Sequence, residues 1–197
     1  MKNLTKFTGI VAAAALMSFY ISCSSSTEKK DNKDSLATSA KSREMYLANA
    51  LKADSALGKD TTYNSRLALE ALKAYTDFTT LFPKDSLTAD YLFKAGQLAA
   101  STGNFKQAAL YYETILDQHT GFKEYAAVCM IAAENYHSNL ANEPKSAARE
   151  KQLYEFIIAK YPNTTFAENA KVLINYIGKS DEELLKDIEK KALQNKK

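Results

Sequence analysis

Three side chains in the predicted folded part could bind a soft metal ion: His119, His137 and Cys129. Zinc sites in proteins usually draw their ligands from closely spaced pairs of cysteine or histidine, and these three residues form no such pair. Both histidines fall in or beside predicted loops, whereas Cys129 lies on a helix face expected to pack. We therefore predict solvated histidines, a buried cysteine that behaves as a small apolar residue, and no metal ion or other cofactor.

Sequence motifs for catalysis give no better candidate. The chain has no G-x-S-x-G turn around a nucleophilic serine and no glycine-rich phosphate-binding loop. Its serines gather in an N-terminal polar segment and at expected helix starts, where a hydroxyl accepts backbone hydrogen bonds. The carboxylates of residues 182–189 belong to a predicted solvated terminal helix. We therefore predict that the protein is not an enzyme.

Residues 1–22 have the pattern of a secretory signal peptide. Lys2 and Lys6 precede a mostly apolar run over residues 9–21, which is too short to span a bilayer core of about 30 Å. A basic start, a short apolar run and a small residue before the cleavage point, here Ser22, are typical of such signals. Without the two lysines the formal charge of +3 falls to +1 (3 − 2), which argues against nucleic acid as a partner.

The segment Tyr20-Ile21-Ser22-Cys23 resembles the lipobox of bacterial lipoproteins. This resemblance implies that Cys23 carries a diacylglycerol on its sulfur and becomes the mature N-terminus, and more than one acyl chain anchors a protein stably. An ordinary signal peptide with an incidental cysteine is the alternative. Residues 23–42 are polar, charged and free of aromatic side chains, so we predict a disordered tether there.

Residues 43–197 are predicted to form a helical domain. The whole chain has only six Gly and three Pro, a composition that favours helix. Apolar residues at helical spacing, interrupted by glycine and proline, predict helices at residues 42–56, 64–82, 87–101, 105–119 and 165–178, with an irregular pair before the last of these. Ser86 is expected to cap the third helix, and Ser180 to open a final one.

Small and aromatic residues repeat along these helices. Tyr75, Tyr112 and Tyr154 each stand two turns before a helix end, and Leu92-x-x-Ala95-Gly96-x-x-Ala99 precedes the second tyrosine. The pattern resembles the tetratricopeptide repeat (TPR), a helix–turn–helix unit of about 34 residues. The resemblance implies an all-α, right-handed TPR-like solenoid of about 3.5–4 helix pairs.

The helix junctions Phe82-Pro83-x-x-Ser86 and Tyr161-Pro162-x-x-Thr165 are similar to those of bacterial envelope TPR proteins. Two families fit: the β-barrel assembly lipoprotein BamD and the Tol-Pal-associated periplasmic protein YbgF. The resemblance implies an outer-membrane lipoprotein that faces the periplasm and acts as a protein-binding scaffold in β-barrel assembly. The alternatives are a YbgF-like Tol-Pal or cell-wall adaptor, and a solute-binding surface lipoprotein.

The concave face of TPR proteins, formed by the first helix of each pair, suits an extended or helical peptide. The resemblance places six residues on that face, three from each of two consecutive pairs: Phe93, Gln97, Ala100, Met130, Glu134 and His137. The partner would then be another envelope protein or a peptide. The alternative is that these side chains are merely exposed, or covered by neighbours.

Four short motifs are similar to O-glycosylation sites on envelope proteins of some Gram-negative bacteria. Each places an aspartate before a serine or threonine, at Ser35, Ser55, Thr61 and Ser86. Ser35 and Thr61 are the favoured positions because both lie in predicted loops. The alternative is that aspartate and serine together simply start a helix.

Overall fold

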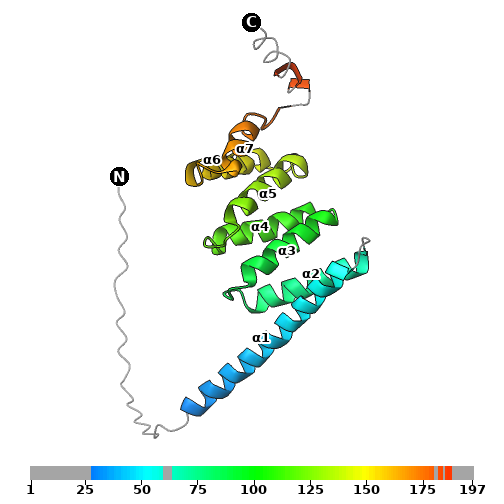
Figure 1. The fold of residues 1–197 in the computed structure, drawn as a ribbon, viewed down its shortest axis with the longest axis vertical. Coiled ribbons are helices and arrows are strands. Elements are labelled where there is room, and N and C mark those ends of the chain that lie inside the picture. Colours follow the sequence, from blue (N-terminus) through cyan, green and yellow to red (C-terminus); the bar gives the residue numbers. More distant parts are fainter. Residues whose placement is uncertain (1–27, 60–63, 180–181, 184, 188–197) are drawn as a thin grey trace, which may run out of the picture. The chain divides into compact units, whose positions relative to one another are not determined.

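The computed structural model describes residues 28–59, 64–179, 182–183 and 185–187. Over these residues the chain forms helices and turns and no strand, which confirms the all-α class. Cys23 and the predicted signal peptide lie outside this part of the chain. The helices are α1 (Glu28–Lys59), α2 (Ser65–Leu81), α3 (Thr88–Ser101), α4 (Phe105–Gln118), α5 (Tyr125–Ser138), α6 (Ser146–Lys160) and α7 (Thr165–Leu173) (Figure 1).

Helix α1 is longer than the sequence predicts. It begins at Glu28 rather than near residue 42, so the segment predicted as a disordered tether is helical from residue 28 onward. That prediction considered only the apolar surface available for burial. A stretch without proline, whose one glycine is Gly58, has enough helix propensity to continue a helix beyond its packed part. The chain divides after Thr38 into two units, residues 1–38 and 39–197.

Within residues 39–197, consecutive helices pack against each other. Each helix from α2 to α6 contacts the next one along the chain, and α5 also contacts α7 (Figure 1). The apolar residues of each helix recur at helical spacing, so they form a stripe that is buried when two neighbours face each other. Residues of α1 from Tyr46 to Leu57 complete this packing against α2 and α3.

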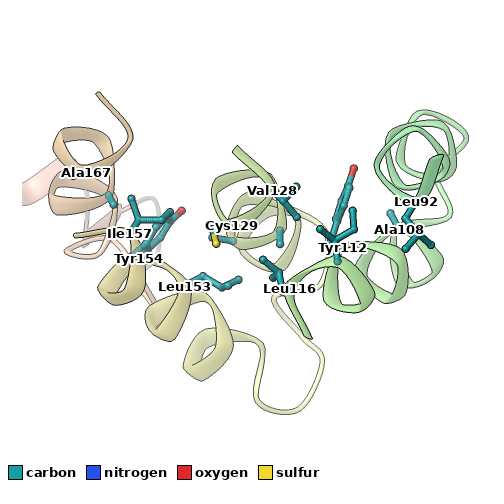
Figure 2. Packing of buried hydrophobic residues seen from close by; sticks show 14 of the residues in the cluster. Leu92, Ala108, Tyr112, Leu116, Val128, Cys129, Leu153, Tyr154, Ile157 and Ala167 are labelled. Carbon is teal, nitrogen blue, oxygen red and sulfur yellow. The ribbon is translucent and has the colours of Figure 1, made fainter. Parts of the chain in front are cut away.

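Two apolar clusters fill the spaces between the helices. The first joins α1, α2 and α3 and consists of Ala50, Ala71, Tyr75, Phe78, Tyr91 and Ala95. The second extends from α3 to α7 and includes Leu92, Tyr112, Cys129, Tyr154, Ile157 and Ala167 (Figure 2). The three tyrosines of the repeated pattern, Tyr75, Tyr112 and Tyr154, are only 2%, 1% and 1% exposed and therefore pack between the helices.

Gly96 allows α3 and α4 to lie close together. A Cβ atom at this position would lie 2.3 Å from Cε1 of the Tyr112 ring, well inside van der Waals contact. Ala108 on α4 and Ala95 and Ala99 on α3 are also fully buried. The small residues of the predicted repeat therefore set the distance between these two helices, because protein interiors are close-packed.

The start of α3 differs from the prediction. Leu87 occupies the N-cap position and no side chain caps the helix, so Ser86 does not have the predicted role. In the turn before the helix, Asp85 Oδ1 accepts a hydrogen bond from the backbone N–H of Leu87 at 3.0 Å. The same carboxylate pairs with the guanidinium of Arg43 in α1, with Arg43 Nη2 3.1 Å from Oδ1. Arg43 holds the pKa of Asp85 below its ordinary value. Asp85 thus joins α1 to the beginning of α3.

Two further predictions change at the ends of helices. The helix predicted for residues 165–178 ends at Leu173 and is followed by turns as far as Gly178, and Ser180 lies outside the described residues. The proposed glycosylation position Ser35 falls within α1 and not in a loop, whereas Thr61 is not described. Gly103, in the turn between α3 and α4, has a positive φ of 78°.

Candidate functional site

A pocket of about 430 Å³ opens between α5, α6 and α7. Three of the predicted groove residues, Met130, Glu134 and His137, line it from successive turns of α5. The remaining lining comes from the end of α5, from α6 and from α7: Ser138, Tyr154, Asn169, Val172 and Leu173. We call these eight residues the α5–α7 pocket. The α7 contribution was missed at the sequence level, since nothing in a local pattern shows which later helix faces α5.

The lining of the pocket combines apolar and polar side chains. Met130, Val172 and Leu173 are its aliphatic residues, and Val172 is 53% exposed although it is a large hydrophobic residue. Glu134, His137 and Asn169 carry the polar groups. Such a surface suits a segment that presents both apolar and polar atoms, because each kind of group then finds a matching environment.

A buried carboxylate lies behind the pocket. The side chain of Glu150 on α6 is 3% exposed, and its Oε1 lies 2.9 Å from Nδ1 of His137. Among the described residues Oε1 has no hydrogen-bonding partner beyond this imidazole contact. Burial raises the pKa of Glu150, while the neighbouring His137 opposes that rise. Burying a carboxylate without full hydrogen bonding is costly, so this position is unusual for a residue that only packs.

The other three predicted groove residues do not join this pocket. Phe93 is half-buried, with its ring centroid 6.4 Å from that of Tyr112 and 6.1 Å from that of Phe122. Ala100 packs partly buried against the same core. Gln97 is exposed and lines a separate pocket of about 380 Å³ between α1, α2 and α3. The six residues therefore occupy different environments.

The pocket that Gln97 lines carries a polar cluster centred on Asp54 of α1. The Tyr75 hydroxyl donates to Asp54 Oδ1 at 2.5 Å, and Lys94 Nζ pairs with the other oxygen. Burial, together with Asp54, raises the pKa of Tyr75 well above its ordinary value. Because the carboxylate is already paired with both groups, this cluster holds α1 against α2 and α3.

The candidate metal ligands lie apart. Cys129 is 1% exposed, as predicted, and burial raises the pKa of its thiol to about 12. His137 is exposed, but His119 differs from the prediction because it is half-buried and its Nε2 is buried without a hydrogen-bonding partner among the described residues. In the part of the chain that the structure describes, histidine, cysteine and carboxylate side chains form no cluster suited to a metal ion.

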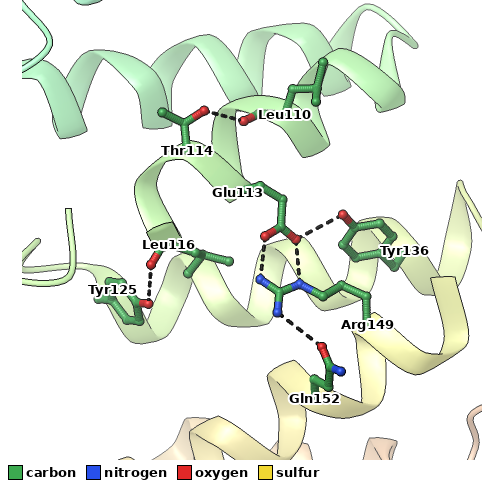
Figure 3. Close-up of polar contacts among 8 residues, drawn as sticks. All are labelled: Leu110, Glu113, Thr114, Leu116, Tyr125, Tyr136, Arg149 and Gln152. Carbon is green, nitrogen blue, oxygen red and sulfur yellow. Dashed lines mark hydrogen bonds and ion pairs between the residues drawn. The ribbon is translucent and has the colours of Figure 1, made fainter. Parts of the chain in front are cut away.

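A partly buried charge pair joins three helices. Glu113 on α4 binds the guanidinium of Arg149 on α6 through both carboxylate oxygens, with Nε 2.8 Å from Oε1 (Figure 3). The Tyr136 hydroxyl of α5 donates to the same Oε1 at 3.0 Å. Both charged groups of this cluster have partners. The side chains of Arg149 and Glu113 are 33% and 23% exposed. We interpret it as structural, since bidentate pairs fix geometry.

Comparison with known families and with curated proteins adds no relative. No family model matches the chain. No curated protein matches it either. Among the helices described here, none is both long enough and apolar enough to cross a membrane.

Proposed function

We propose that this protein is a lipid-anchored, TPR-like scaffold that binds other proteins of the bacterial envelope. In this proposal the consecutive helices form a right-handed solenoid of about 3.5–4 pairs. The packing of each helix on the next, and the small residues between α3 and α4, support the solenoid. Lipid on Cys23 would anchor the protein to the outer membrane, facing the periplasm. There it would act in β-barrel assembly, in a role like that of BamD.

The observation that carries the binding role is the α5–α7 pocket. Glu134 and His137 are exposed there and Met130 is half-buried, so a partner segment can reach both polar and apolar atoms. The pocket lies between α5 and α7, which contact each other across α6. In a TPR arrangement these are the first helices of consecutive pairs. A binding role is also consistent with Cys129, whose buried thiol is unsuited to nucleophilic chemistry.

Site-specific crosslinking in cells tests the binding role. A photoreactive residue at Glu134 is preferable to one at Phe93, because Phe93 packs against Tyr112 and Phe122. We expect adducts with envelope proteins, identified by mass spectrometry, from Glu134 and not from the control position Leu69, which is 64% exposed on α2. Identical adducts from the two positions, or none from Glu134, would contradict a binding site at this pocket.

The anchor is tested separately. The intact mass of the envelope-purified protein should correspond to a chain that begins at Cys23 and carries acyl chains. Cys23→Ser should move the protein from the membrane fraction to the soluble periplasmic fraction. An unmodified Cys23 in the purified protein would reject the anchor while leaving the pocket experiment unaffected.

A further inference from the structure

We propose that the α5–α7 pocket recognises a basic residue, arginine or lysine, in an extended segment of its protein partner. This inference rests on the proposed binding function and names the chemistry of the ligand. It is carried by the carboxylate of Glu134 in the lining, the buried carboxylate of Glu150 beside His137, and the aliphatic side chains of the lining, which contains no lysine or arginine.

The residue type changes at one repeated position of the helices. In α2 and α4 the residue one turn before the buried tyrosine is Ala71 or Ala108, and both are fully buried. In α6 the corresponding residue, one turn before Tyr154, is Glu150, which is 3% exposed. Alanine satisfies the packing at this position at no electrostatic cost, whereas a buried carboxylate needs a positive partner.

The electrostatic field inside the pocket is negative because of two carboxylates. Tyr154 lines it, and burial raises the pKa of this tyrosine to about 12, with Glu150 and then Glu134 adding to the rise. Two carboxylates from two helices thus act on one hydroxyl. His137 is the one group of the lining that can carry positive charge, and it lies beside Glu150. A cation in the pocket would further balance the negative charge of Glu134 and Glu150.

The shape of a basic side chain matches the mixed lining of the pocket. Lysine and arginine have long aliphatic stems that pack on apolar surface while the charged end stays among polar groups. Met130, Val172 and Leu173 offer such a surface, and Glu134 stands on the same helix one turn beyond Met130. A cavity of about 430 Å³ has room for this side chain together with part of the adjoining backbone.

Methionine methyl NMR tests the inference on the full chain. The sequence has four methionines, and Met130 lines the pocket whereas Met45, 53% exposed on α1, does not. With 13C-methyl methionine, Met130→Leu assigns the pocket signal. The probes are acetyl-Ala-Arg-Ala-amide, its lysine and glutamate counterparts, and acetyl-Ala-citrulline-Ala-amide, which keeps the shape of arginine without its charge.

We expect the arginine and lysine peptides to shift the Met130 signal saturably and to leave Met45 unchanged. Glu134→Gln should weaken this binding about five-fold, because it removes one charge-assisted contact. Glu168→Gln is the matched control, since Glu168 is exposed on α7 outside the pocket lining and its substitution removes the same charge. It should leave the affinity unchanged.

Several results would overturn the inference. Citrulline binding as tightly as arginine would show that charge is not recognised. Equal shifts at Met45 and Met130, or equal weakening by Glu134→Gln and Glu168→Gln, would indicate non-specific attraction. A response to the glutamate peptide alone, or to none of the peptides, would also reject a basic ligand. The crosslinking experiment at Glu134 tests the binding function separately. If crosslinked adducts form at Glu134 while the peptide experiments are negative, the pocket binds a protein partner but does not recognise a basic residue.

Discussion

At the scale of single residues, Glu150 and Glu113 show two ways of placing an acid in a helical interior. Glu113 has Arg149 and Tyr136 as partners for its two oxygens. Glu150 is more deeply buried, and within the part of the chain that the structure describes its Oε1 has the imidazole of His137 beside it and no hydrogen-bonding partner apart from that contact. The cost of a buried charge depends on how completely its partners satisfy it. We therefore expect ionisation of Glu150 to oppose folding.

Substitution of Glu150 by glutamine tests this expectation. The folded-state pKa of Glu150 lies above the ordinary value of 4.5, so the folded state favours the protonated carboxyl. This contribution to stability is fully present below pH 4.5 and is lost as the pH rises through the folded-state pKa. Glu150→Gln should therefore unfold at a higher temperature than the wild type at pH 8, with the difference vanishing near pH 4. Thermal unfolding followed by circular dichroism at both pH values measures it.

The control for this experiment is Glu155→Gln, an exposed position on the same helix, where no pH-dependent difference is expected. If Glu150→Gln were less stable than the wild type at pH 8, the contact between the carboxylate and His137 would outweigh the cost of burial.

At the scale of helices, the distance between α3 and α4 depends on Gly96. Alanine normally stabilises a helix interior by about 1 kcal/mol relative to glycine. Here its Cβ would overlap the ring of Tyr112, a side chain that is only 1% exposed. Because overpacking costs about 1–3 kcal/mol, Gly96→Ala should lower the free energy of unfolding by about 1 kcal/mol in urea titrations.

Two further variants give this prediction its controls. Gly58→Ala, in α1 with open space around the new methyl group, should be neutral or stabilising. Tyr112→Leu should abolish the penalty of Gly96→Ala, because it removes the ring that the methyl group meets. If the single variant Gly96→Ala were more stable than the wild type, α3 and α4 would lie further apart than the structure shows, and the prediction would be wrong.

At the scale of the whole domain, the Glu113–Arg149 pair connects the second helices of what we propose are consecutive pairs. Stability in stacked helical repeats is roughly the sum of the repeat terms and the terms between neighbours. A double-mutant cycle with Glu113→Gln and Arg149→Met should show a coupling of about 1–2 kcal/mol, since the two groups share two hydrogen bonds away from full solvent exposure.

The exposed pair Arg66–Glu70, one turn apart on α2, is the reference for that cycle. Pairs of this kind couple by only about 0.3–0.5 kcal/mol. A coupling between Glu113 and Arg149 no larger than this reference would mean that the contact adds little to the interface between pairs.

Local patterns were sufficient for the helices and for much of their packing. Tyr75, Tyr112 and Tyr154 are buried as their spacing indicates, and Gly96 faces Tyr112. These predictions succeed because helical periodicity places residues three and four positions apart on one face, and that face is then buried. The extension of α1 and the contact of Asp85 with Arg43 and Leu87 were not foreseen, since each depends on competition between neighbouring segments.

The amino-acid sequence alone determined the all-α class and the order of the helices, because these properties depend on neighbours a few residues apart. Only the tertiary structure decided which polar residues meet. Met130, Glu134 and His137 share a pocket with Val172 and Leu173, while Phe93 is covered by other rings. The physical reason is that a pocket joins helices distant in the chain, and their mutual approach depends on the volumes of all the side chains between them.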